Sequence, residues 1–236
     1  MRKRIKDKNS QLCIGIDPPV ELSNEQKLNF ALQIISKTSK FASAYKPNRQ
    51  YFLGFPVEWM QEITREIKRQ NAVSIIDHKL SDIGSTNLAA IRHIAEEGYD
   101  YFTFSPFAGN LEQTSIDAHD HGVKIISLTL MSNPEAVWMT EGAYIRFAEQ
   151  AEKYADGMVI GSTNHITKEH LLIVRERAPS PFVLAPGIGF QGGSPDLILD
   201  VFGKDAIFNS SRSILQAEDP MQAAKDLRDL IRSYWE

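Results

Sequence analysis

The chain alternates from end to end between short apolar runs and segments with helical periodicity. Eight such runs, rich in β-branched and aromatic residues, are separated by stretches in which apolar residues recur every three or four positions. Runs that are apolar at nearly every position are typical of parallel strands buried on both faces. The predicted strands are residues 12–16, 41–45, 73–76, 99–104, 123–130, 157–160, 182–185 and 206–208.

The helical segments between these runs have recognisable ends. Ser23 and Gln26 form a capping-box pattern, and Asp219 precedes Pro220 as an N-cap residue before a proline at the first helical position. No linker-like stretch divides the 236 residues. The alternation therefore predicts one α/β domain, residues 1–236, folded as a (β/α)8 TIM barrel. In such barrels, functional side chains lie at the C-terminal ends of the strands.

Composition excludes several classes of protein. There are 26 Lys and Arg against 30 Asp and Glu, a net charge of −4, which argues against a nucleic-acid-binding surface. Every apolar run is far shorter than the ~20 residues of a membrane-spanning helix. The single cysteine, Cys13, excludes an internal disulfide and a multi-cysteine metal site. We therefore expect a cytoplasmic protein with neither nucleic acid nor membrane as partner.

Charged residues follow each of the first three predicted strands. Asp17 follows the first, Lys46 the second, and Asp77, Lys79 and Asp82 the third. Residues two apart on a strand point the same way, so Asp77 and Lys79 are expected to share the barrel mouth if the strand keeps its register. Two ammonium groups alternating with two carboxylates can hold a lysine protonated as a general acid. A purely structural ion-pair network has the same spacing and is the alternative interpretation.

A glycine-rich segment, PGIGFQGG, follows the seventh predicted strand and begins at Pro186. It contains the G-x-G-x-x-G string of dinucleotide-binding proteins, but that string usually opens the first βαβ unit. A glycine-rich loop after the seventh strand is instead the usual phosphate site of a barrel. Arg212, after the eighth strand, adds a bidentate cation. The pattern therefore favours phosphate binding, with a tight turn as the alternative.

The string Asp77-x-Lys79-x-x-Asp82-Ile83-x-x-Thr86 resembles the signature of the orotidine 5′-phosphate decarboxylases. The resemblance extends in chain order to residues after other strands, namely Asp17, Lys46, Ser132, Pro186 to Gln191, and Arg212. Members of that family are homodimeric (β/α)8 barrels that use neither a metal nor an organic cofactor. They convert orotidine 5′-phosphate to uridine 5′-phosphate and carbon dioxide, the last step of de novo pyrimidine synthesis. The resemblance implies this activity for the present chain.

The resemblance also implies a role for each matching residue. Lys79 is expected to protonate C6 of the pyrimidine as the substrate carboxylate leaves, with Asp77 against that carboxylate and Lys46 and Asp82 completing the array. Asp82 and Thr86 are expected to enter the partner subunit's site. The substrate-binding residues implied are Asp17, Lys46 and Thr86 at the ribose, Ser132 at the pyrimidine, and Pro186, Gln191, Ser211 and Arg212 around the phosphate.

This chain departs from the family pattern in two places. Ser211 stands before the phosphate-binding arginine where the family often has glycine, and its hydroxyl can itself donate to a phosphate. The segment around Ser132, LMSNP, is recognisable but is not a strict motif.

Three other functions fit parts of the same pattern. Magnesium-dependent sugar-phosphate decarboxylases and aldolases of the same barrel group share the Asp-x-Lys-x-x-Asp string. They resemble one another in an acidic residue after the second strand, where Lys46 would repel a metal ion. A phosphate-ligand binding protein has no need of the full charge array. A Schiff-base aldolase needs a neutral lysine, whereas Asp77 and Asp82 favour the ammonium form of Lys79.

Overall fold

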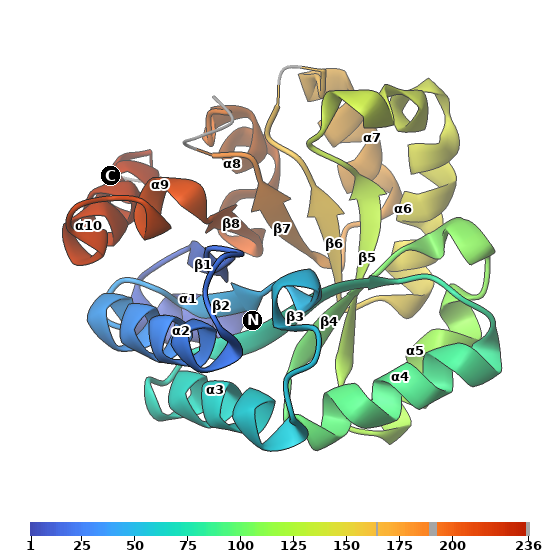
Figure 1. The fold of residues 1–236 in the computed structure, drawn as a ribbon. Helices are drawn as coiled ribbons and strands as arrows, with labels where there is room; N and C mark the ends of the chain where they lie inside the picture. Colours follow the sequence, from blue (N-terminus) through green and yellow to red (C-terminus); the bar gives the residue numbers. More distant parts are fainter. Residues whose placement is uncertain (164, 189–192, 235–236) are drawn as a thin grey trace.

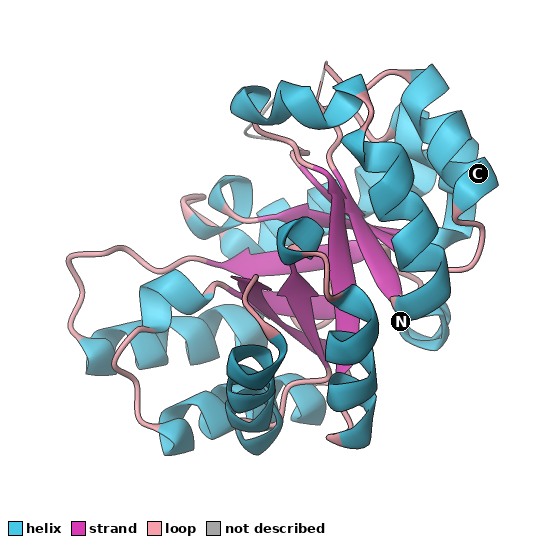
Figure 2. Ribbon diagram, turned by 90° about the vertical axis from the view of Figure 1, so that its right-hand side faces the viewer, coloured by secondary structure: helices cyan, strands magenta, loops and turns pink. Residues whose placement is uncertain are grey.

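The computed structural model describes residues 1–163, 165–188 and 193–234, with the side chains of 139–141 left aside. Eight parallel strands close into a barrel in sequence order, and the eighth pairs with the first. Helices surround the strands on all sides in both views (Figures 1 and 2). The predicted (β/α)8 TIM barrel is therefore confirmed.

Each predicted run overlaps a strand. The strands are β1 (Leu12–Ile16), β2 (Ala44–Pro47), β3 (Val73–Leu80), β4 (Tyr101–Phe104), β5 (Lys124–Leu130), β6 (Gly157–Ile160), β7 (Phe182–Pro186) and β8 (Ala206–Ser210). Of these, β2 and β4 begin later than predicted, and β2, β3 and β8 end later. The prediction ended the second and third strands too early, because Lys46 and Asp77 interrupt the apolar runs. Backbone pairing continues through both, and Asn48 forms an isolated bridge with Asp77 just beyond β2. Both charged side chains are thus held by the sheet itself.

The helices begin and end near the predicted signals. The α-helices are α1 (Arg2–Lys8), α2 (Asn24–Thr38), α3 (Val57–Arg69), α4 (Gly84–Glu96), α5 (Leu111–Asp120), α6 (Ala143–Tyr154), α7 (Lys168–Arg177), α8 (Asp196–Phe202), α9 (Arg212–Leu215) and α10 (Pro220–Ser233). Short 3-10 helices are η1 (Arg49–Phe52), η2 (Pro106–Ala108), η3 (Pro134–Glu141) and η4 (Gly203–Asp205). The capping box at Ser23 is formed, and the Asp219 side chain accepts hydrogen bonds at the start of α10.

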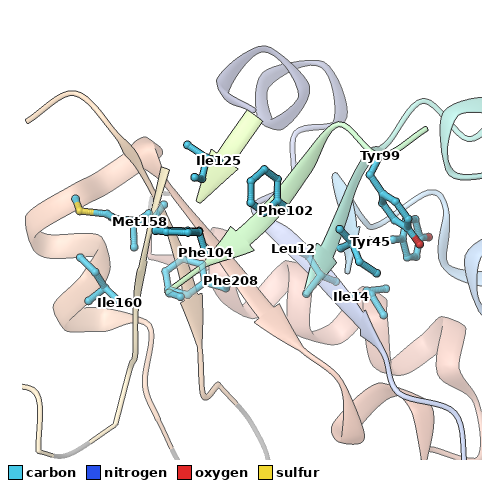
Figure 3. Packing of buried hydrophobic residues seen from close by; sticks show 14 of the residues in the cluster. Leu12, Ile14, Tyr45, Tyr99, Phe102, Phe104, Ile125, Met158, Ile160 and Phe208 are labelled. Carbon is cyan, nitrogen blue, oxygen red and sulfur yellow. The ribbon is translucent and has the colours of Figure 1, made fainter. Parts of the chain in front are cut away.

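Two apolar layers explain where the functional side chains point. The outer layer lies between strands and helices, with Phe102, Phe104 and Phe208 among its members (Figure 3). The inner layer fills the barrel and consists of Cys13, Ala44, Val73, Ile75, Tyr101, Ile126, Leu128, Val159, Phe182, Leu184 and Ile207, with Ile5 of α1. Because strand side chains alternate between faces, Lys46, two residues after Ala44, and Asp77, two after Ile75, continue the inner layer toward the mouth.

The N-terminal helix α1 closes the opposite end of the barrel, a feature that the basic N-terminal sequence did not predict. Met1 and Ile5 pack against the inner layer, and the Met1 amino group donates to the Tyr101 hydroxyl at 3.2 Å. Access to the barrel interior is therefore favoured at the C-terminal ends of the strands. None of the helices that the structure describes is long and apolar enough to cross a membrane.

Candidate active site

A chain of charged contacts crosses the barrel mouth between β2 and β3. Lys46 Nζ lies 2.5 Å from Asp77 Oδ2, and Lys79 Nζ lies 2.7 Å from Asp77 Oδ1. The side chains of Lys46 and Asp77 are only 9% and 10% exposed, whereas that of Lys79 is 42% exposed. Asp77 thus bridges two ammonium groups, one buried beneath the mouth and one open to it.

Thr103 on β4 completes this cluster and was missed by the sequence analysis. Its hydroxyl donates to Asp77 Oδ1 at 2.9 Å, and its Oγ1 accepts from the backbone N–H of Lys79 at 2.9 Å. A signal was present, because Thr103 is the one polar residue in the YFTF strand and lies two positions after the inward-facing Tyr101. We call Lys46, Asp77, Lys79 and Thr103 the charged wall.

The end of β3 does not keep the regular register that the sequence analysis assumed. Pairing with β4 shifts between Ile76 and Leu80, and Lys79 has a φ of 51°, in the left-handed region. A lysine rarely adopts this conformation, and such local strain is typical of functional sites. The expected meeting of Asp77 and Lys79 nevertheless occurs, because the Lys79 backbone is held by Thr103 while its ammonium turns back to Asp77.

The charges in the wall stabilise one another. Burial acts to raise the pKa of Asp77, but the charges of Lys46 and Lys79 and their hydrogen bonds outweigh it and hold that pKa below its usual value. Burial acts to lower the pKa of Lys46, and the carboxylates of Asp77 and then Asp17 outweigh it and raise that pKa. The ionised pair therefore persists throughout the neutral range.

Asp17 lies just after β1, and one oxygen of its carboxylate has an unused capacity to accept a hydrogen bond from the described residues. Its Oδ1 is buried and accepts no hydrogen bond from the residues described here. A buried, unsatisfied carboxylate oxygen costs free energy unless a donor reaches it. The position suits a ligand that carries hydroxyl groups.

A cavity of about 130 Å³ lies between the charged wall and an apolar surface. Leu128, Val159 and Leu184 form the apolar side, and Met131, Ser132 and Pro186 also line the cavity. A second cavity, of about 470 Å³, is lined by residues that include Asp17, Tyr51 and Arg212. A larger one, of about 530 Å³, lies around Arg2, Gln11 and Asp205, among the elements at the N-terminal ends of the strands. Of these three cavities, the first two are lined by predicted site residues that the structure describes.

The structure describes three of the four predicted phosphate-binding residues, namely Pro186, Ser211 and Arg212. Arg212 is the exposed first residue of α9 and lines the second cavity. Ser211 Oγ lies over β1, because a Cβ built on Gly15 would be only 1.9 Å from it. The Ser211 hydroxyl thus occupies space that the absence of a side chain at Gly15 provides. Gln191 lies outside the described residues.

Asp82 and Thr86 lie apart from the charged wall of their own chain. Both are exposed, and among the described residues no hydrogen bond or ion pair joins Asp82 to Lys79. The Asp82 carboxylate instead accepts from the backbone N–H of Ile83 at 2.7 Å. The next residue, Ile83, is 67% exposed, and Phe107, in η2 after the neighbouring strand β4, is 80% exposed. One chain therefore assembles three members of the predicted four-residue array.

Comparisons with known proteins identify the family of this chain. Residues 10–227 match the family model described as the orotidine 5′-phosphate decarboxylase / HUMPS family. An orotidine 5′-phosphate decarboxylase of Thermomicrobium roseum is 30% identical over 98% of this chain and 91% of that protein. One of Pyrococcus abyssi is 31% identical over 86% and 93%.

A solved structure gives the same result for the fold. The orotidine 5′-monophosphate decarboxylase of Methanocaldococcus jannaschii, complexed with the inhibitor BMP, superposes with a TM-score of 0.77 at 27% identity. The match covers 93% of this chain and 97% of that one. The chain therefore belongs to the orotidine 5′-phosphate decarboxylase / HUMPS family.

Proposed function

We propose that this protein is an orotidine 5′-phosphate decarboxylase, a carboxy-lyase that forms uridine 5′-phosphate and carbon dioxide in pyrimidine biosynthesis. The observation that carries the proposal is the Lys46–Asp77–Lys79 chain of contacts in the barrel mouth. A sugar-phosphate enzyme that stabilises an enediolate with a metal needs acidic ligands there. A lysine bound to Asp77 at that position opposes a cation.

The proposed chemistry uses Lys79 as the proton donor. The bond between C6 and the carboxylate carbon breaks, and its electron pair stays on C6 while carbon dioxide leaves. A proton moves from Lys79 Nζ to C6, and the neutral amine then regains a proton from solvent. Lys79 suits this role because its side chain is the most exposed of the charged side chains in the wall, and Asp77 accepts a hydrogen bond from its ammonium at 2.7 Å.

Lys46 and Asp77 are proposed to hold the field in which the carbanion forms. The negative charge of Asp77 opposes the substrate carboxylate, and this repulsion is relieved as carbon dioxide departs. The charge of the buried Lys46 lowers the pKa of Asp77 and so favours its ionised form. Because the charges are fixed by mutual hydrogen bonds, little reorganisation is needed when charge develops on C6.

Substrate binding is proposed to extend from the small cavity toward Arg212. The pyrimidine would lie against Leu128, Val159 and Leu184, with Ser132 as a hydrogen-bond partner. The unsatisfied Asp17 oxygen suits a ribose hydroxyl. The phosphate would bind Arg212, Gln191 and the loop that leaves β7 at Pro186, with the Ser211 hydroxyl nearby.

The test is the loss of absorbance as orotidine 5′-phosphate is converted in the presence of EDTA. We expect full turnover under these conditions. A hexulose phosphate and a keto-gulonate phosphate, each with and without Mg²⁺, are the matched comparison substrates. Failure to convert orotidine 5′-phosphate, or turnover only of a sugar phosphate with Mg²⁺, would overturn the proposal.

We also propose that the active unit is a homodimer in which Asp82 and Thr86 enter the partner's site. The proposal is supported by the exposure of both residues together with that of the apolar Ile83, which follows Asp82. Mixing inactive Lys79→Ala with inactive Asp82→Asn tests it. Random re-association leaves one intact site in half the dimers and restores about a quarter of wild-type activity. If the mixture stays inactive after subunit exchange has been verified, Asp82 acts within its own chain.

A further inference from the structure

The segment after β6 lies between the two loops proposed to bind the ends of the substrate. We call residues 161–163 and 165 the β6 connector. On one side it contacts Met131 and Ser132, which follow β5, and on the other it contacts Pro186, which ends β7. Ile166, only 3% exposed, anchors the connector in the core.

Two side chains of the connector hold the main chain on the β5 side. The Thr163 hydroxyl donates to the Ser132 carbonyl at 2.8 Å. His165 Nε2 lies 3.0 Å from the Met131 carbonyl, and because a carbonyl only accepts, this nitrogen carries a proton. His165 Nδ1 lies 3.3 Å from Thr163 Oγ1, so the two side chains also contact each other.

The connector and Ser132 also approach more closely than side chains would normally allow. A Cβ built on Gly161 would lie 2.6 Å from Ser132 Cα and 2.8 Å from its backbone nitrogen. Such distances are shorter than any ordinary contact, so only glycine fits at this point. The Gly161 backbone is therefore packed directly against the Ser132 main chain.

The other side of the connector holds the glycine-rich loop at both of its described ends. The backbone N–H and hydroxyl of Ser162 each donate to the Pro186 carbonyl at 3.0 Å. At the far end, a Cβ on Gly193 would lie 2.3 Å from the Ser162 carbonyl oxygen, and the Gly193 N–H donates to the Gly187 carbonyl. Ser162 thus contacts both the beginning and the end of the loop.

We propose that Thr163 and His165 are positioning residues that tie the Ser132 main chain to the loop after β7, so that phosphate binding also fixes the contact to the pyrimidine. The inference rests on the proposed function. Binding energy from a part of the substrate remote from the reacting bond raises the rate when it positions that bond. The β6 connector supplies a short physical link between the two ends.

The test compares substrates with and without the phosphate group in Thr163→Val, with Thr163→Ser as the matched control that keeps the hydroxyl. We expect Thr163→Val to lower kcat/KM for orotidine 5′-phosphate about tenfold, the effect of one lost hydrogen bond. For the nucleoside orotidine alone, the loss should stay below about twofold. Thr163→Ser should remain near wild type with both substrates.

A second pair of variants tests the other contact, and inorganic phosphate provides an independent measurement. His165→Gln keeps an amide donor and should exceed His165→Leu in kcat/KM for orotidine 5′-phosphate. Inorganic phosphate should stimulate orotidine turnover in wild type and in Thr163→Ser more than in Thr163→Val. Thermal unfolding of every variant separates these effects from loss of folded protein.

The outcomes distinguish the inference from the proposed function. Equal losses for orotidine 5′-phosphate and orotidine, or no loss in Thr163→Val and His165→Leu, would show that the β6 connector does not couple the two ends. A wild-type protein that fails to convert orotidine 5′-phosphate would overturn the proposed function and this inference with it.

Discussion

The two sides of the barrel mouth are held together by different kinds of contact. The charged wall, on β2 to β4, consists of side chains bonded directly to one another, with Asp77 in contact with Lys46, Lys79 and Thr103. The opposite side, after β5 to β8, is held by hydrogen bonds to main-chain carbonyls and by closely packed glycines, and it ends in the exposed Arg212. We call it the binding side. The charged groups of the wall are thus already paired with one another, whereas the substrate contacts proposed for the binding side depend on a bound ligand.

The difference indicates a division of labour in the proposed reaction. Leu128, Val159 and Leu184 face the wall across the small cavity. Apolar neighbours strengthen the electrostatic effect of the fixed charges on whatever lies between. Changes in the wall should therefore act mainly on kcat, and changes on the binding side mainly on KM. Each prediction below tests that separation.

Asp77→Asn should have the largest effect. An amide cannot accept hydrogen bonds from two ammonium groups through both of its terminal atoms, and it lacks the charge that orients Lys79. We expect kcat for orotidine 5′-phosphate to fall at least about 10³-fold. Asp120→Asn, the same change on the exposed end of α5, is the control and should leave kcat unchanged. If Asp77→Asn raised KM and left kcat unchanged, the proposed separation between kcat effects in the wall and KM effects on the binding side would be wrong.

The same variant should change how stability depends on pH. The pKa of Asp77 is lowered from its ordinary value of 3.8, so its contribution is present above that value and is lost as pH falls toward the folded pKa. The pKa of Lys46 is raised above 10.5, so its contribution is lost only as pH rises beyond that value. Urea unfolding should show a gap between wild type and Asp77→Asn that is constant near neutrality and narrows below about pH 4. A gap of constant size down to about pH 3 would contradict this assignment.

Arg212→Ala should produce the next largest effect. This effect should fall mainly on KM, whereas that of Asp77→Asn falls on kcat. Losing a charge-assisted contact to phosphate is worth about 2–4 kcal/mol, or roughly 30-fold to 1000-fold in kcat/KM. Steady-state kinetics should place most of this loss in KM. Arg177→Ala, at the exposed end of α7, is the matched control. An unchanged KM in Arg212→Ala would refute the phosphate assignment.

Ser132→Ala should have the smallest effect of the three substitutions. It removes one neutral hydrogen bond to the pyrimidine, and we expect kcat/KM to fall by no more than about tenfold. Isothermal titration with uridine 5′-phosphate should show a matching loss of affinity. A loss as large as that of Asp77→Asn would mean that the binding side takes part in the chemistry.

Much of this arrangement could be predicted because it depends on local sequence. The apolar runs predicted the strands and their order, and the placing of Lys46, Asp77 and Lys79 after them predicted the shared mouth. Ser211 could be named as a departure from the family pattern. Its fit against Gly15, however, depends on how β8 pairs with β1, which one strand does not reveal.

The parts that could not be predicted depend on contacts between elements far apart in the sequence. The register shift at the end of β3 is accompanied by a hydrogen bond from the Lys79 backbone to Thr103 on the next strand. Thr163 and His165 gain their partners only when the turns after β5 and β6 are brought together. Asp82 shares a motif with Asp77, yet it lies beyond the end of β3, two residues before α4 begins, and is exposed. Spacing along the chain did not distinguish these two carboxylates.

The central claim is that a charge array already assembled in the protein supplies the proton through Lys79. The most direct test is kcat for orotidine 5′-phosphate in EDTA for wild type and Lys79→Ala, with folding verified by thermal unfolding. We predict that wild type turns over without metal and that Lys79→Ala loses at least about 10³-fold in kcat. A Lys79→Ala protein that keeps wild-type kcat would contradict the account.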